Sequence, residues 1–258
     1  DVACIGIEHK IGMKGSSTCM MNFGENDLCR GYLVGEPGMG LAYMFDMVNL
    51  ARMAVGLESV AFATNIYANV LDYAQQRVQG DMWGQKGNRV RIVEHADVRR
   101  MLMNIKALAE GMRALVYKSY FMEDISKASG DAQERDFARG RLELLTPVVK
   151  AYCADRIFEI GREGIQILGG YGYTHEYPVE QYMRDSKIFS IWDGTNFIQS
   201  ADLVGRKLNM AKGAVFQNWV EEITAFIAKN RNAEAFAREM GILEEALGAL
   251  VGLAGDYR

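Results

Sequence analysis

The sequence predicts a mainly α-helical protein, a long antiparallel helical bundle preceded by a short β remnant. Three observations support this fold class. Apolar residues recur at spacings of three and four over stretches of about thirty residues, which is the period of an amphipathic helix. Only three prolines interrupt the 258 residues. Short β-favouring runs separated by turn-forming residues are confined to the segment before Pro37.

The segment Asp1–Glu36 is expected to form strands and hairpins. The runs CIGI, TCMMNF and YLVGE favour β-structure, and the turn-forming sequences GMKGSS and GENDLCRG lie between them. Pro37 and Gly38 close this segment. From Leu41 onward the apolar spacing changes to that of helices.

The rest of the chain is expected to fold into helices joined by short loops. The second helix has the most regular apolar stripe, from Val98 to Val116. Asp131 and Glu134 resemble a capping box that starts the third helix, and Pro147 is expected to kink it. Helices are predicted at 40–77, 98–128, 131–168, 178–188, 196–211 and within 215–253, with a polar loop at 80–91.

Composition excludes several classes of partner. The 29 Lys and Arg against 33 Asp and Glu give a net charge of −4, without a basic patch interleaved with aromatics, so no nucleic acid is expected. No apolar run reaches the roughly 18 residues of a membrane span, so membrane insertion is not expected. The four cysteines lack metal-ligand or disulfide spacing and are expected to be reduced and buried: Cys4, Cys19, Cys29 and Cys153. A cytoplasmic protein without a metal is expected, and the opening DVACIGIEHKIG suggests a fragment.

Two segments stand out chemically, since the common nucleophile, zinc and phosphate-loop motifs are absent. In 169–188 (GGYGYTHEYPVEQYMRDSKI), three glycines allow either a tight helix connection or close approach to a ligand. In 191–199 (IWDGTNFIQ), Asp193 follows Trp192 in an apolar turn before a helix. Its carboxylate is either a helix N-cap or a desolvated base with a raised pKa. His9, His95 and His175 are interpreted as structural or solvated.

Together these segments resemble the C-terminal part of an acyl-CoA dehydrogenase. Residues 8–36 are similar to the family's K-x-G-x-x-G-S-S-T-x-x-x-x-F stretch, at the end of its middle β-domain. Arg77 in AQQRVQG resembles the arginine of the helix-ending Y-A-x-x-R-x-x-F-G, and Gln166, Gly169 and Gly170 resemble Q-x-x-G-G. Asp193 stands where the family has its Y-E-G-T turn. The motifs occur in the family's order over most of the chain.

The resemblance implies three parts: the end of the middle β-domain at 1–37, the C-terminal helical bundle domain at 38–212, and an additional helical extension at 213–258. A polar loop after Gly80 replaces the family's Phe-Gly. This loop and the chain beyond the last helix resemble the extended bacterial branch that includes methylmercaptopropionyl-CoA dehydrogenases.

The resemblance also implies a function. Such an enzyme binds FAD non-covalently and oxidises an acyl-CoA thioester at its Cα–Cβ bond. Asp193 is then the base that removes the α-proton, while hydride passes to flavin N5. The Asp193 backbone N–H is implied as one donor to the thioester oxygen, where enolate charge develops.

Further site residues follow from the same resemblance. Arg77 is implied at the FAD pyrophosphate, across a subunit interface, and Gln79 is implied among the residues that bind the cofactor. Gln166, Gly169 and Gly170 are implied at the adenosine side of FAD, from a neighbouring subunit. Thr195 is implied to contact FAD, and Arg52 and Gly194 to shape the acyl-CoA site. The alternative readings are that Arg52 and Arg77 are helix-surface charges and that Thr195 is only a cap.

The substitution of Asp for the usual Glu leaves the reaction open, since Asp193 is shorter by about 1.5 Å. The backbone can restore the reach, the substrate can be bulky or cyclic, or the enzyme can resemble the nitroalkane oxidase branch, which also uses Asp. Besides a dehydrogenase and an oxidase, the remaining alternative is a non-catalytic helical oligomerisation module. The partners implied for a dehydrogenase are acyl-CoA, an electron-transfer flavoprotein or similar acceptor, and further copies of the chain in a dimer or tetramer.

Overall fold

The computed structural model describes residues 1–256, and it confirms the mainly α-helical fold. Tyr257 and Arg258, the last residues of the predicted extension, lie outside the described residues. The helices are α1 (Gly40–Gln76), α2 (Ala96–Ala128), α3 (Ala132–Leu168), α4 (Val179–Ser186), α5 (Asn196–Gly205), α6 (Ala214–Asn230) and α7 (Ala237–Asp256). The strands are β1 (Val2–Ile7), β2 (Cys19–Phe23), β3 (Val78–Asp81) and β4 (Arg89–Arg91). Short 3₁₀ turns are η1 (Ile92–Glu94), η2 (Gly169–Tyr173), η3 (Lys187–Ser190), η4 (Lys207–Gly213) and η5 (Glu234–Phe236).

The chain divides into two compact units. The first contains Asp1–Arg113 and Cys153–Asp193, and the second contains Ala114–Tyr152 and Gly194–Arg258. The sequence-based boundaries at 37 and 212 follow a different principle, the resemblance to a domain family, and they stay a prediction.

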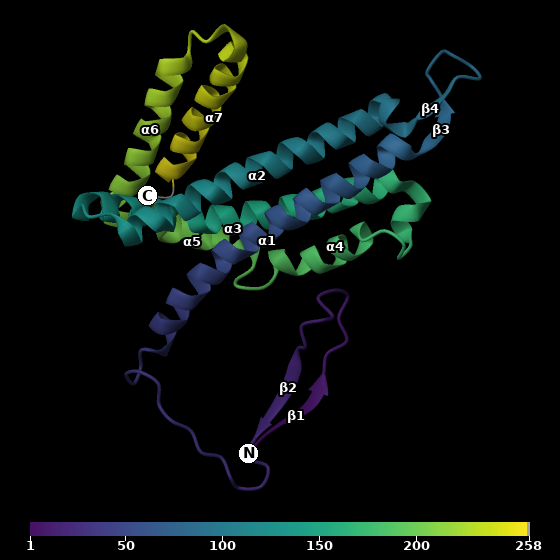
Figure 1. The fold of residues 1–258 in the computed structure, drawn as a ribbon. Helices are drawn as coiled ribbons and strands as arrows, with labels where there is room; N and C mark the ends of the chain where they lie inside the picture. The colour runs from purple at the N-terminus through teal and green to yellow at the C-terminus, as the bar shows by residue number, and fades with distance from the viewer. Residues whose placement is uncertain (257–258) are drawn as a thin grey trace. The chain divides into compact units, whose positions relative to one another are not determined.

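In the first unit the long helices run antiparallel, as the sequence predicts. Arg113 on α2 donates to Thr64 Oγ1 on α1 at 2.9 Å. Asn104 on α2 donates to Glu163 Oε2 on α3 at 2.8 Å. The start of α2 therefore lies beside the ends of α1 and α3, an arrangement that can be followed in Figure 1. Buried side chains from all three helices form the core, among them Ile66, Val70, Ile105, Met112, Ile157 and Ile160.

A glycine on α3 sets how closely its neighbours approach. A Cβ on Gly164 would lie 2.8 Å from Ile66 Cγ2 on α1 and 3.0 Å from Val179 Cγ1 on α4. Both distances are shorter than normal carbon contacts, so only glycine fits between these two side chains. The first turn of α4 is thereby packed against α3 and α1.

The β1–β2 hairpin is attached to α4 through its connecting loop. The strands pair antiparallel from Val2 opposite Phe23 to Ile7 opposite Cys19 (Figure 1). In the loop, the Met13 N–H donates to Asp185 Oδ1 at 2.6 Å, and Arg184 Nη1 donates to the Ile11 carbonyl at 2.8 Å. A Cβ on Gly12 would lie 2.6 Å from the Arg184 backbone. The motif KIGMKGSST and the segment 169–188, both singled out in the sequence, thus meet here.

In the second unit, α6 and α7 form an antiparallel pair (Figure 1). Leu144 from α3, Leu208 from η4, Phe216 from α6 and Ala254 from α7 make one buried cluster. Phe216 stacks on Trp219 with 5.9 Å between ring centroids. The extension is therefore packed on its own unit through aromatic and aliphatic burial.

Several expectations about individual elements are wrong. The predicted polar loop at 80–91 contains part of the β3–β4 hairpin, whose turn uses Gly84 and Gly87 at positive φ. The predicted helix 196–211 stops at Gly205, because Arg206 leaves α-helical geometry with φ −124° and ψ −51°, and the chain continues as η4, in which Met210, Ala211 and Lys212 are not helical. The run YLVGE, residues 32–36, forms no strand in the structure.

Two further expectations fail at the level of side chains. Only Cys153 is buried among the four cysteines; Cys4 and Cys19 are exposed because a two-stranded hairpin leaves both of its faces uncovered, and Cys29 is exposed in the irregular segment after β2. The capping box is not reciprocal: Asp131 accepts from the Gln133 N–H at 2.9 Å, but Glu134 accepts from the Ser129 hydroxyl instead of the Asp131 N–H. The third helix nevertheless begins at Ala132, where the cap predicts it, and Pro147 lies inside it.

Among the residues described, no helix combines the length and hydropathy that a membrane span requires.

Candidate functional site

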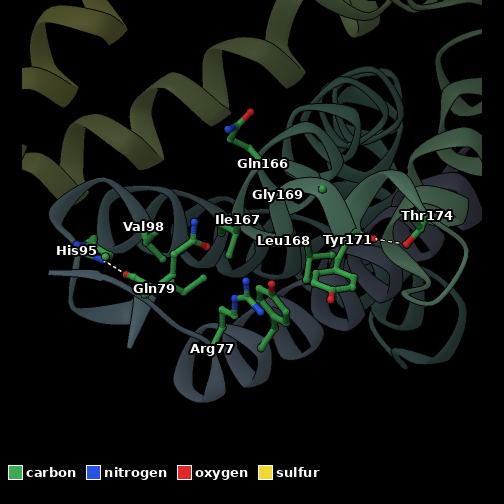
Figure 2. Close-up of a pocket in the computed structure, with 14 residues that line it drawn as sticks. Arg77, Gln79, His95, Val98, Gln166, Ile167, Leu168, Gly169, Tyr171 and Thr174 are labelled. Atoms are coloured by element: carbon green, nitrogen blue, oxygen red, sulfur yellow. Dashed lines mark hydrogen bonds between the residues drawn. The ribbon is translucent and has the colours of Figure 1, made fainter. Parts of the chain in front are cut away.

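A cavity of about 720 Å³ lies in the first unit, where α1 ends, α2 begins and α3 passes into η2. Five residues predicted to bind the cofactor line it: Arg77, Gln79, Gln166, Gly169 and Gly170. Figure 2 shows them together with Tyr171, Thr174 and His95. Residues about ninety positions apart in the sequence therefore contribute to one concave surface.

Arg77 occupies the first non-helical position after α1. Its N–H closes the last turn on the Tyr73 carbonyl at 2.8 Å, and its own carbonyl accepts from the Ile92 N–H at 2.8 Å. The backbone is thus fixed on both sides while the side chain stays exposed. The guanidinium carbon lies 5.8 Å from the Tyr171 ring centroid, within range of a cation–π interaction. No carboxylate pairs with Arg77 within residues 1–256, so its charge is available to an anion.

A cluster of tyrosine rings lies beside Arg77. Tyr73 contacts both Tyr171 and Tyr177 edge to face, with centroids 6.4 and 5.4 Å apart. Partial burial raises the pKa of Tyr73, and the neighbouring positive charge of Arg77 acts in the opposite direction. The phenol therefore stays neutral beside the guanidinium.

The β3–β4 hairpin places Gln79 at the cavity. His95 Nε2 lies 2.8 Å from the Gln79 carbonyl oxygen, as the dashed line in Figure 2 marks. Since a carbonyl can only accept, Nε2 carries the proton and donates. Gly80 adopts φ +74°, and a Cβ there would lie 3.4 Å from His95 Nε2. His95, interpreted from the sequence as structural or solvated, is a structural contact of this hairpin.

The end of α3 supplies the opposite wall. Gly169 has φ +62°, a left-handed conformation that favours glycine, and it ends the helix. No atom lies within 4 Å of a Cβ built on Gly169 or Gly170, so a ligand can approach this backbone closely. Gln166 is exposed, and in Figure 2 its side chain points away from the Arg77 guanidinium. The side chains of Arg77 and Gln166 therefore point in different directions from the lining of this cavity.

The remaining predicted residues are not in this cavity. Arg52 on α1 is buried, and its Nε donates to the Asp193 carbonyl at 3.1 Å. The reading of Arg52 as a helix-surface charge is therefore wrong. Asp193 itself has φ +50°, a strained conformation for a residue other than glycine, and one that Asp tolerates better than most.

The helix cap after this turn is Thr195. Its hydroxyl accepts from the Ile198 N–H at 3.4 Å, at the start of α5. The reading of Asp193 as the N-cap is therefore wrong, and the reading of Thr195 as a cap is confirmed. The cap uses one lone pair of the hydroxyl oxygen, so the hydroxyl hydrogen can still be donated to another group.

A buried lysine that sequence reasoning missed holds the next peptide. Lys150 on α3 is fully buried, and its Nζ donates to the Gly194 carbonyl at 2.7 Å and to Asn196 Oδ1 at 3.2 Å. Gln199 Nε2 donates to the same carbonyl at 3.0 Å. The signal was present in the sequence as a single charge in the apolar run PVVKAYCA.

A second missed residue is Glu58 on α1. Its pKa is raised, mainly because part of the side chain is desolvated and also because of the negative charge of Asp193. The two carboxyl groups therefore lie within electrostatic range, a pairing often found at sites of proton transfer.

A further cavity, of about 490 Å³, lies between the 10–18 loop and the α4–η3 segment. It is lined by Lys10, Arg184 and Lys187 and by Trp192, the residue before Asp193. Trp192 stacks on Phe189, and its buried indole Nε1 has no hydrogen-bond partner in the described part of the chain. A buried donor without a partner and three cations suit an anionic or acceptor-rich planar group.

Comparison with known proteins identifies the family. The family model for the acyl-CoA dehydrogenase C-terminal domain matches residues 38–208. A butyryl-CoA dehydrogenase of Syntrophomonas wolfei is 44% identical over 256 residues, covering 96% of this chain and 42% of that protein. The 3-methylmercaptopropionyl-CoA dehydrogenase of Ruegeria pomeroyi is 37% identical, covering 99% of this chain and 44% of that protein. The chain thus spans less than half the length of these relatives.

Solved structures of acyl-CoA dehydrogenases also resemble this chain. Caenorhabditis elegans ACDH-11, in complex with C11-CoA, matches with a TM-score of 0.82 and 22% identity over 99% of this chain and 40% of that chain, a likeness of fold. Butyryl-CoA dehydrogenase from Megasphaera elsdenii matches with a TM-score of 0.63 and 27% identity over 80% of this chain and 49% of that chain. The resemblance stated from the motifs, including that to the methylmercaptopropionyl-CoA branch, is confirmed: the chain belongs to the acyl-CoA dehydrogenase family.

Proposed function

We propose that this chain forms the C-terminal part of an FAD-dependent dehydrogenase that oxidises a linear acyl-CoA thioester at its Cα–Cβ bond. The observation that carries the proposal is that five predicted site residues line one cavity, among them an arginine with no carboxylate partner in the described part of the chain. The names of the relatives add the substrate class, since they are dehydrogenases of butyryl-CoA and of other acyl-CoA thioesters.

The residues at both cavities fit FAD. The Arg77 guanidinium can bind a pyrophosphate through several parallel donors, and the open backbone at Gly169 and Gly170 admits a flat ring system. Lys10, Arg184 and Lys187, which line the second cavity together with Trp192, can interact with acceptor atoms of a flavin. FAD, when bound, supplies an acceptor for the hydride that leaves Cβ. Thr195 can contact it through its free donor, and Gln79 and Gln166 through their amides.

Asp193 removes the proton from Cα of the thioester in this proposal. The base must lie against the α-carbon, and Arg52 contributes by fixing the orientation of the Asp193 carbonyl. Lys150 and Gln199 fix the Gly194 carbonyl in the same way. Proton transfer by a positioned carboxylate is worth about 10²–10⁴-fold in rate. Glu58, whose pKa is raised, can receive the proton afterwards or tune the charge of Asp193.

The partners follow from the same reading. The partner that would take up the electrons is an electron-transfer flavoprotein or similar acceptor, and further copies of the chain in a dimer or tetramer would complete the adenosine side through Gln166, Gly169 and Gly170. The cytoplasmic location stays the prediction from the sequence.

The direct test is the absorption spectrum of the full-length protein under anaerobic conditions, before and after addition of a panel of acyl-CoA thioesters. We expect bleaching by linear thioesters. Asp193→Asn should keep the flavin and lower the bleaching rate by about 100-fold or more, because the amide cannot accept the proton. Bleaching of the variant at the parent rate would remove Asp193 as the base.

Two other outcomes separate the alternatives. A bound flavin that no thioester reduces, with rapid oxygen uptake on a nitroalkane, would favour an oxidase on the same fold. A colourless protein that takes up no added FAD would favour a non-catalytic helical module.

The cofactor assignment has its own test. Arg77→Gln should weaken FAD binding at least tenfold, because the amide lacks the charge and most donors of the guanidinium. Folding should be unaffected, since the Arg77 side chain is exposed. Lys86→Gln, in the exposed β3–β4 turn and outside the cavity, is the matched control. Equal FAD affinity in both variants, measured by equilibrium dialysis, would contradict the assignment.

A further inference from the structure

The second unit contains an apolar cavity that the proposed reaction does not use. Its volume is about 580 Å³, within the range of small-molecule sites. Its walls come from α2, α3, α5, η4, α6 and α7 and include Leu144, Leu208, Phe216, Trp219, Ile223 and Leu250. Three charged residues also line it: Lys118, Arg141 and Glu222.

Arg141 is the unusual member of this wall. It lies on α3 and is 3% exposed, and burial lowers the pKa of its guanidinium. Its Nη2 lies 2.8 Å from Oε2 of Glu222, a carboxylate whose side chain is 48% exposed. The ring of Phe137 lies 5.4 Å below the guanidinium carbon. Nη1 and Nη2 are both buried, and neither has a hydrogen-bond partner among the residues that the structure describes, so the contact of Nη2 with Glu222 is an ion pair without hydrogen-bond geometry.

This arrangement leaves the guanidinium incompletely satisfied. An arginine carries five N–H donors in a fork that matches a carboxylate, and a buried donor without a partner destabilises the folded state. Glu222 compensates only in part, because it remains half in solvent and approaches one nitrogen. With Lys118, the charged residues of the lining are two cations and one anion. The cavity is thus complementary to one additional negative charge attached to an apolar body.

We propose that this cavity binds an amphipathic monocarboxylate of the fatty-acid type. The carboxylate is bound by Arg141, in place of or beside Glu222, and the aliphatic tail lies among Leu144, Leu208, Phe216 and Trp219. None of the proposed catalytic residues lines this cavity. The site requires the free acid, because a thioester has no carboxylate to offer the guanidinium.

The probe is decanoate, titrated into the full-length protein by calorimetry in the presence of saturating decanoyl-CoA, with 1-decanol as the uncharged analogue. We expect saturable binding of decanoate and at least tenfold weaker binding of 1-decanol. Arg141→Met, which keeps an apolar side chain of similar length, should weaken decanoate binding at least tenfold and leave 1-decanol unchanged. Arg139→Met, on the exposed side of the same helix, is the matched control and should bind as the parent does.

A second variant keeps the test independent of folding at Arg141. Glu222→Gln removes the competing carboxylate from a half-exposed position, so decanoate should bind several-fold more tightly. The proposal is overturned if decanoate shows no saturable binding, if Arg141→Met binds it as well as the parent, or if Glu222→Gln weakens it. Failure of binding together with a change of oligomeric state in Arg141→Met would assign the cavity to a protein interface instead.

Discussion

At the scale of single residues, the backbone conformation of the turn before α5 explains why it accepts Asp at position 193. Asp193 has φ +50° and Gly194 has φ +87°, so two consecutive residues are left-handed before α5. Asp and Asn adopt this conformation more readily than Glu does. The Asp that departs from the family's usual Glu is therefore compatible with the turn that holds it, and Asp193→Asn preserves that turn while removing the carboxylate.

Gly12 gives a prediction at the same scale. A Cβ on Gly12 would lie 2.6 Å from the Arg184 backbone, which cannot move as a flexible side chain can. Gly12→Ala should therefore lower the free energy of unfolding by about 1–3 kcal/mol. Gly15→Ala is the control, since nothing lies within 4 Å of a Cβ there. Chemical denaturation of both variants measures the difference, and equal stability would mean that the loop does not pack on α4 as described.

At the scale of elements, helical periodicity in the sequence predicts the long helices well. The expected spans 40–77 and 131–168 differ from α1 and α3 by one residue at an end. Periodicity fails where glycines and polar residues govern the backbone. The β3–β4 hairpin was missed because its pairing joins short polar strands, which carry no alternation of apolar residues.

The candidate site was predictable only in part, because motifs identify some of its residues while others depend on tertiary contacts. The cavity residues Arg77, Gln166, Gly169 and Gly170 could be found from motifs, but a motif does not say what surrounds it. Lys150 and Glu58 depend on tertiary contacts, with the turn at Gly194 and with Asp193 respectively. No local pattern in the sequence encodes such contacts.

The packing of helices supports a prediction for Gly164. Gly164→Ala would place a Cβ 2.8 Å from Ile66 and 3.0 Å from Val179, so α1 and α4 must move away from α3. We expect a loss of about 1–3 kcal/mol in the free energy of unfolding. Gly111→Ala, inside α2 with no atom within 4 Å of the new Cβ, should instead stabilise by up to about 1 kcal/mol, because alanine favours helix. Thermal unfolding of the pair gives opposite shifts if the packing is as described.

At the scale of the whole molecule, the low net charge of −4 conceals a few strong local pairs. Glu180 on α4 accepts from Arg184 Nε at 2.7 Å and contacts His175 Nδ1 at 2.8 Å. The hydrogen bond from Arg184, aided by His175, lowers the pKa of Glu180 from 4.5 to about 2. The folded state thus holds this carboxylate in its charged form far below the pH at which the unfolded chain protonates it.

The dependence of global stability on pH follows. Because the folded pKa is depressed, the contribution of Glu180 is present above pH 4.5 and is lost as the pH falls toward about 2. Glu180→Gln should therefore be less stable than the parent at pH 7 by about 1–2 kcal/mol, a figure reduced for the solvent around Arg184. The difference should shrink progressively between pH 4.5 and 2. Urea denaturation at several pH values measures it, and Glu110→Gln, an exposed pair with Lys106, should show no such trend.

The hydrogen bond from Met13 to Asp185 also has a consequence for biosynthesis. It joins positions 172 residues apart, so it cannot form until nearly all of the intervening chain has been made. At about 5–20 residues per second, the β1–β2 loop emerges from the ribosome about 10–30 s before its anchor on α4 does. During that interval the hairpin lacks this attachment and its edges are open to other strands. A chaperone that binds this hairpin would therefore protect it until α4 has been synthesised.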